Sequence, residues 1–184
     1  NTPAYKIASF ECTDLSLIKK VARTKKPLII STGMANDTEI SEAVEIAMKF
    51  GNGELTLLHC VSGYPSPPNE YNLRTLADMK TRFGVNVGLS DHTLSNVTAI
   101  SAVALGVVMV EKHVTLDRNG GGPDDSFSLE EQGLAELCSS TKTAWQTLGK
   151  VNYERTEAEK GNVKYRRSLY YVRSLKQGDV ITEN

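Results

Sequence analysis

Two short apolar segments of this chain each end in a cluster of polar residues that includes a histidine. The first ends in Ser90–His92 and the second in Glu111–His113. Both segments have the length and apolar character of buried strands, so the two imidazoles occupy equivalent places at successive strand ends. Neutral imidazole nitrogens bind divalent metals and leave coordination positions for water or substrate. We therefore predict a metal site at His92 and His113, with Asp91 and Glu111 completing or orienting its shell.

The elements that must position these residues alternate between strand and helix. Apolar segments alternate with amphipathic helical patterns five times, with a repeat of about 25 residues, which indicates parallel strands joined by crossover helices. Asn36 with Glu39 and Ser128 with Glu131 have the spacing of capping boxes. A charged segment follows at 151–167, and a further strand is predicted at 169–172. The five expected strands of the sheet lie at 4–9, 28–31, 55–60, 85–90 and 107–111.

Polar side chains follow every predicted strand, and ligands of parallel α/β sheets bind beyond the carboxyl ends of the strands. Hydroxyl groups and ammonium groups at such ends suit an anion such as phosphate. Strict alternation would place Lys6 and Ser9 on opposite faces, so a bulge is expected between them. A structural alternative is that the hydroxyls only cap the next helix. We expect His59, inside its strand, to be structural. The candidate anion ligands are Ser9, Ser31, Ser90, Lys6 and Lys112.

Composition limits the possible partners. The 184 residues suffice for one core, and the net charge of −1 gives no general attraction to nucleic acid or to an anionic membrane. No apolar run is long enough to span a bilayer. The three cysteines share no metal-ligand spacing, which favours free thiols in a reducing cytoplasm.

The chain contains, in this order, the runs Lys6–Glu11, Ser31–Ala35, His59–Cys60, Tyr64–Pro67, Gly88–Thr93, Glu111–His113 and Gly122–Asp124. In their order and spacing these runs resemble the sialic acid synthase family, whose members condense phosphoenolpyruvate with an amino sugar. The resemblance implies an α/β fold, a TIM (β/α)8 barrel of which 1–150 supplies strands four to eight. It also implies a linker at 151–167 and, at 168–184, the start of an antifreeze-like (SAF) domain. The full-length protein is then expected to be a cytoplasmic homodimer.

The resemblance also implies a role for each matching residue. A divalent metal, Mn²⁺ or Mg²⁺, would be bound by His92 and His113. Catalytic roles would fall to Glu11 as proton acceptor or sugar-orienting group, with Lys6 and Asp91 beside the reacting centre. Substrate contacts would come from Ser9, Ser31, Ser62, Tyr64, Ser90, Lys112 and Asp124.

Three positions resemble the pseudaminic acid synthases more than the neuraminate synthases: Phe10, Ser62 and the run Asp125–Leu129. The acceptor would then be 2,4-diacetamido-2,4,6-trideoxy-altrose, and the product pseudaminic acid. The Gly122–Asp124 triplet is shared with the neuraminate and legionaminate branches, which remain alternatives. Outside this chemistry, a metal-dependent hydrolase or an aldolase on a similar barrel is the competing hypothesis. A third alternative is an inactive fragment, since five strands leave two open sheet edges.

Overall fold

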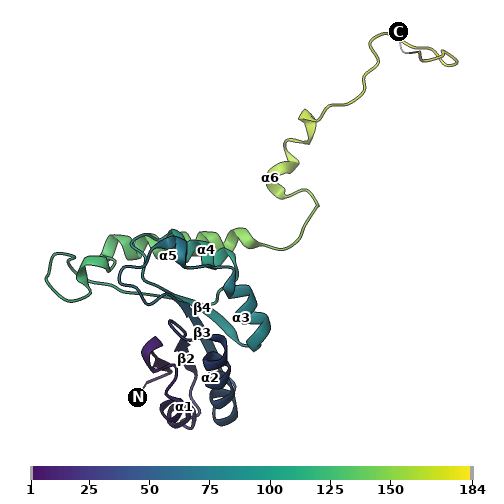
Figure 1. Cartoon of the computed structure of the whole chain (residues 1–184). Helices are drawn as coiled ribbons and strands as arrows, with labels where there is room; N and C mark the ends of the chain where they lie inside the picture. Colours follow the sequence, from purple (N-terminus) through teal and green to yellow (C-terminus); the bar gives the residue numbers. More distant parts are fainter. Residues whose placement is uncertain (1, 183–184) are drawn as a thin grey trace. The chain divides into compact units, whose positions relative to one another are not determined.

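The computed structural model describes residues 2–182 and divides the chain into two compact units, one ending at Gly149 and the other beginning at Lys150. The first unit holds one parallel sheet in the order β1-β2-β3-β4-β5. Figure 1 labels its strands β2, β3 and β4. Sequential order in space is the arrangement of strands around a barrel wall. The strands are β1 (Tyr5–Ile7), β2 (Leu28–Ser31), β3 (Leu55–Cys60), β4 (Asn86–Asp91) and β5 (Val110–Lys112).

A helix follows each strand and packs on the same face of the sheet. The amphipathic pattern predicted all five, and the capping box of Asn36 and Glu39 forms as expected. The second expected box does not form, because the Ser128 hydroxyl donates to the Asp124 carbonyl and Glu130 precedes the helix instead. The helices are α1 (Leu15–Ala22), α2 (Asp37–Phe50), α3 (Thr75–Phe83), α4 (Val97–Ala104) and α5 (Glu131–Leu148).

The hydrophobic core lies between the sheet and these helices. Alternate strand residues enter it, for example Leu55 and Leu57 of β3 and Val87 and Leu89 of β4. Because strand side chains alternate between faces, the residues between them point to the other face, away from the helices. This second face is called the inner face below.

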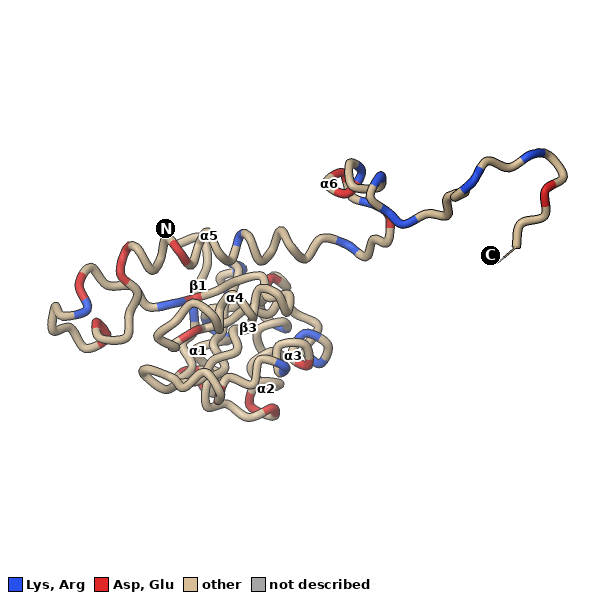
Figure 2. Tube along the Cα trace, turned by 90° about the horizontal axis from the view of Figure 1, so that it is seen from above, with Lys and Arg blue, Asp and Glu red and all other residues tan. Residues whose placement is uncertain are grey.

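The unit from Lys150 contains the helix α6 (Glu157–Lys160) and a short 3-10 turn at Val163–Tyr165. No strand forms at 169–172, so that prediction was wrong. The predicted start of an antifreeze-like domain at 168–184 includes two residues outside the described range and stays a prediction. Figure 2 shows basic and acidic residues interspersed along the described chain. None of its described helices is long and apolar enough to cross a membrane.

Candidate active site

The inner face carries an ion pair between the first and last strands of the sheet. The Lys6 ammonium of β1 lies 2.9 Å from the Glu111 carboxylate of β5. The Ser90 hydroxyl of β4 donates to the same carboxylate at 2.9 Å. Glu111 therefore joins Lys6 and Ser90, two of the predicted substrate-binding residues, whereas the role predicted for it in the metal shell stays a prediction.

Asp91 and Lys112 lie on the opposite face, where the structure differs from the sequence-based expectation. The parallel register pairs Ser90 with Glu111 and Asp91 with Lys112. Because side chains alternate along a strand, the first pair points to the inner face and the second pair points to the helix-covered face. The Lys112 ammonium contacts the Asp91 carboxylate at 2.8 Å, and the two side chains are 3% and 0% exposed. It also donates to two main-chain carbonyls. A lysine and an aspartate buried in this way cannot reach a substrate on the inner face, and we assign them a structural role.

Ser9 reaches the site by a route that the sequence did not predict. The strand β1 stops at Ile7, and Ser9–Glu11 forms a 3-10 turn in place of the expected bulge. The Ser9 hydroxyl accepts from the Gly33 amide at 3.1 Å and donates to the Cys60 thiol at 3.4 Å. Glu11 is exposed, and one of its oxygens accepts from the Ala8 amide at 2.8 Å, which closes the turn.

Gly33 is needed at this point because three side chains surround it. A methyl group at its Cα would lie 2.2 Å from the Ser62 hydroxyl oxygen, 2.8 Å from that of Ser9 and 3.1 Å from the Cys60 sulfur. Ser31, two residues earlier, also belongs to the inner face. Its hydroxyl oxygen is buried and has no hydrogen-bond partner among residues 2–182. A buried hydroxyl without a partner is costly, so Ser31 is a good candidate for a ligand contact.

The two predicted metal ligands lie side by side. The imidazole centroids of His92 and His113 are 5.3 Å apart, and the angle between the ring planes is 68°. Nδ1 of His92 lies 2.9 Å from the Val61 carbonyl, which can only accept, so in the neutral ring Nδ1 carries the proton and Nε2 has the free lone pair. Nδ1 of His113 lies 3.4 Å from the Asp124 carboxylate.

The donor set of this pair fits a divalent metal held by two imidazoles. Residues 2–182 contain no group of three or more His, Cys, Asp or Glu side chains placed to hold a metal, so water or substrate would supply the remaining ligands. A carbonyl or carboxylate partner on one ring nitrogen is the usual arrangement for a metal-binding histidine, because it fixes the tautomer and orients the ring.

Aromatic side chains surround the two histidines. The Tyr64 ring is 4.3 Å from the His92 ring and 5.8 Å from the His113 ring, centroid to centroid. Phe127 lies 5.2 Å from His113 and 5.6 Å from Tyr64. Tyr64 and Asp124, the two predicted sugar contacts, thus both lie beside the histidine pair.

Cys60 is a site residue that the sequence-based analysis missed as a candidate. Burial alone would raise the pKa of its thiol, but contacts with His92 and Ser9 outweigh burial and lower it. The sulfur lies 3.9 Å from His92 Nδ1 and 3.9 Å from the Ser62 hydroxyl. The sequence offered one signal for Cys60, which is that it ends a predicted strand, directly after His59.

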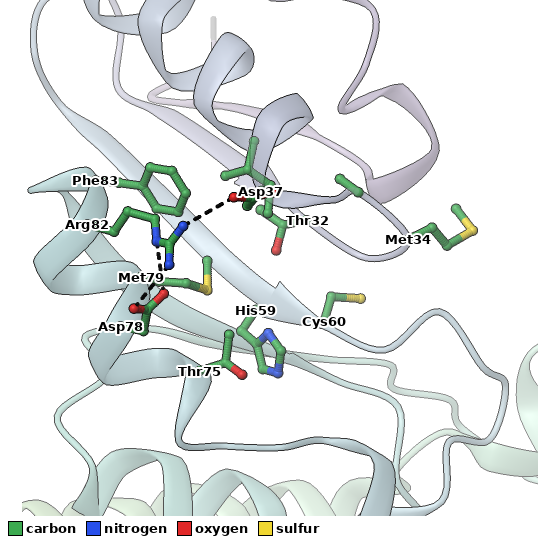
Figure 3. Close-up of a pocket in the computed structure, with 12 residues that line it drawn as sticks. Thr32, Met34, Asp37, His59, Cys60, Thr75, Asp78, Met79, Arg82 and Phe83 are labelled. Carbon is green, nitrogen blue, oxygen red and sulfur yellow. Dashed lines mark hydrogen bonds and ion pairs between the residues drawn. The ribbon is translucent and has the colours of Figure 1, made fainter.

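A cavity of about 360 Å³ lies on the helix-covered side of the sheet, and Cys60 also lines it (Figure 3). Arg82 of α3 bonds both Asp78 and Asp37 at its wall. His59 lines this cavity, and its Nε2 is 2.5 Å from the Tyr71 carbonyl. His59 therefore faces away from the other two histidines, in keeping with the structural role expected for it.

Comparison with known proteins gives the following matches. Residues 1–153 match the model of a family described as the NeuB family. The chain is 39% identical to a pseudaminic acid synthase of Helicobacter pylori and 41% identical to an N,N'-diacetyllegionaminic acid synthase of Campylobacter jejuni. These alignments cover 100% and 97% of this chain but 54% of each relative, so the chain spans about half their length.

The structure is also similar to the crystal structure of an N-acetylneuraminic acid synthetase from Leptospira borgpetersenii in complex with citrate. The TM-score is 0.82 at 34% identity, and the match covers 92% of this chain and 59% of that one. The predicted fold class is confirmed: the five parallel strands and their helices form about half of a TIM barrel.

Proposed function

Because the chain belongs to the NeuB family, we propose that the full-length protein condenses phosphoenolpyruvate with an N-acetylated amino sugar, giving a nine-carbon sugar acid and phosphate. The observation that best supports this proposal is the inner face itself. It places an ammonium group and serine hydroxyls beside two neighbouring imidazoles. An anionic substrate and a carbonyl compound could therefore meet there.

Phosphoenolpyruvate would bind through Lys6 and the serines. The Lys6 ammonium supplies charge, and the Ser90 hydroxyl is already directed at the Glu111 carboxylate beside it. The unpartnered Ser31 hydroxyl would gain the acceptor that it lacks in the free protein. Ser9 and Ser62, which adjoin Cys60, would complete this set of hydroxyls.

The acceptor sugar would bind on the histidine side of the face. His92 and His113 would hold Mn²⁺ or Mg²⁺, which when bound polarises a carbonyl oxygen. The Tyr64 ring would pack against the sugar, and the exposed Asp124 carboxylate would accept hydrogen bonds from its hydroxyl or amide groups. The acceptor aldehyde carbon would then lie within reach of C3 of phosphoenolpyruvate.

The reaction forms one carbon–carbon bond and breaks one bond to phosphate. C3 of phosphoenolpyruvate attacks the aldehyde carbon, and the aldehyde oxygen becomes a hydroxyl. Water adds to C2, and phosphate leaves from the resulting adduct. Glu11, exposed at the end of the β1 turn, would accept a proton from the water or orient the sugar.

We propose 2,4-diacetamido-2,4,6-trideoxy-altrose as the acceptor, on the strength of Phe10, Ser62 and the run Asp125–Leu129. The relatives alone do not decide this point, because a pseudaminic and a legionaminic acid synthase match almost equally well. The amino sugars that lead to legionaminate and neuraminate are therefore the competing acceptors.

The experiment is a condensation assay of the full-length protein with phosphoenolpyruvate, Mn²⁺ and each of the three acceptor sugars. Phosphate release and the mass of the sugar acid are both measured. We expect stoichiometric phosphate and pseudaminic acid with the altrose derivative. Phosphate release without any sugar would indicate hydrolysis, and no product with any of the three acceptors would refute the proposal.

A further inference from the structure

The loop between β3 and α3 holds His92 at three points. The Ser66 amide donates to the His92 carbonyl at 3.0 Å, and Nδ1 of His92 donates to the Val61 carbonyl at 2.9 Å. The third contact is to a side chain, since the His92 amide donates to the Tyr71 hydroxyl at 2.6 Å. Only this third contact can be removed by substituting a side chain of the loop.

The Tyr71 hydroxyl makes a second bond on the other side of Asp91. It donates to the Ser90 carbonyl at 3.2 Å while it accepts from His92. The residue is 1% exposed, and its main-chain carbonyl is held by His59 of β3. Tyr71 therefore links β3 to the main chain of Ser90 and of His92, whose side chains both belong to the inner face.

The position of His92 explains why its amide needs such a partner. The ladder between β4 and β5 ends at the pair of Asp91 and Lys112, so His92 lies one residue beyond the sheet hydrogen bonds. A buried amide at that place requires another acceptor. The ring of phenylalanine would fill nearly the same core volume, so the hydroxyl serves these two main-chain contacts rather than packing.

We propose that Tyr71 is a positioning residue that sets the orientation of His92 and Ser90 at the end of β4. The proposal rests on the proposed function only in naming the ligands that these two residues would bind. Outer partners that orient a metal-binding histidine typically change metal affinity by about 10–100-fold when they are removed. A loss of the Tyr71 hydroxyl should act in the same way.

The test compares Tyr71→Phe with Ile18→Val in the full-length protein. Ile18 is fully buried in α1, away from the inner face, so its variant reports loss of core stability alone. Thermal melting, Mn²⁺ affinity and the NMR signals of ¹⁵N-labelled histidine are measured for both. We expect both variants to melt at lower temperature, but only Tyr71→Phe to bind Mn²⁺ about tenfold more weakly and to shift the His92 amide and ring signals.

Unchanged Mn²⁺ affinity and unchanged His92 signals in a folded Tyr71→Phe protein would overturn the proposal, since Tyr71 would then act only in the core. If the variant does not fold, hydrogen exchange of the wild-type His92 amide decides instead. Slow exchange supports the bond to Tyr71, and rapid exchange contradicts it. None of these signals depends on which sugar is condensed. A failure of the proposed reaction could therefore be told apart from a failure of the proposed role of Tyr71.

Discussion

Lys6 and Glu111 form an ion pair of 2.9 Å although they belong to the first and last strands of a five-stranded sheet. Neighbouring strands are about 4.8 Å apart, so the outer strands of a flat sheet would be separated by about 19 Å. Lysine and glutamate side chains together cannot span that distance. The sheet therefore curves strongly, as part of a barrel wall does, and the curvature brings the predicted anion ligands together.

The same ion pair leads to a prediction about anion binding. Glu111 holds the Lys6 ammonium, so an anionic substrate must compete with a carboxylate for it. Glu111→Gln keeps the shape and a hydrogen-bond acceptor but removes the charge. Both side chains are partly exposed, so the effect is modest, and we expect inorganic phosphate to bind about two- to fivefold more tightly. Isothermal titration calorimetry at constant ionic strength measures this, and weaker phosphate binding would show that Glu111 assists the anion instead.

Lys112 should affect stability rather than substrate binding. Its partner Asp91 is fully buried, so Lys112→Met would leave an unpaired carboxylate in the core. Breaking a buried pair in this way typically lowers the free energy of unfolding by about 3–5 kcal/mol. The double variant Asp91→Leu/Lys112→Met should lose less, because it leaves no uncompensated charge. Urea unfolding measures both, and a loss of phosphate affinity at unchanged stability would instead favour a substrate contact for Lys112.

Gly33 should tolerate no side chain. An added methyl group would force apart the hydroxyls of Ser9 and Ser62, and the displaced groups are candidate substrate ligands. We expect Gly33→Ala to weaken phosphoenolpyruvate binding at least tenfold, because these contacts would be lost together. Gly161→Ala is the matched control, since nothing lies within 4 Å of the corresponding position there. Equal affinity of the two variants would show that Ser9 and Ser62 do not bind the substrate.

The cysteines should differ in their pH-dependent reactivity. Burial, with a smaller contribution from Glu39, raises the pKa of Cys12 to about 11, whereas Cys138 is exposed. Only the thiolate reacts with iodoacetamide, so at pH 8 only about one Cys12 in a thousand is reactive even when it is reached. We expect mass spectrometry to find Cys138 alkylated first, and the Cys12 rate to rise about tenfold per pH unit up to its pKa. Rapid labelling of Cys12 at pH 8 would contradict its burial.

The sequence predicted the sheet better than the details of the site. Continuous apolar runs gave the bounds of β2 and β3 as Leu28–Ser31 and Leu55–Cys60, because buried strands leave that pattern. The predicted site combined Ser90 and Glu111 with Asp91 and Lys112. Strand alternation puts these two pairs on opposite faces of the sheet. It could not tell which pair faces the helices, since that depends on how the sheet packs.

The contacts beyond the strands could not be predicted from the sequence. Tyr71 lies in the irregular loop between β3 and α3, just after the 3-10 turn at Pro68–Glu70. Its hydroxyl contacts the His92 amide, 21 positions further along the chain, and no periodicity describes such a contact. The turn at Ser9–Glu11 is likewise local geometry that places Ser9 beside Cys60. The segment 169–172 has the β-branched and aromatic composition of a strand, but no strand pairs with it in the described chain.

The most direct test of the site is Mn²⁺ binding by the full-length protein and by its His92→Ala/His113→Ala variant. Isothermal titration calorimetry measures the affinity, and circular dichroism confirms that both proteins are folded. We expect one site per chain in the wild type and no measurable binding in the variant, because the two imidazoles supply the protein's nitrogen ligands. A double variant that binds Mn²⁺ as tightly as the wild type, or a folded wild type that binds none, would contradict the paired-histidine site.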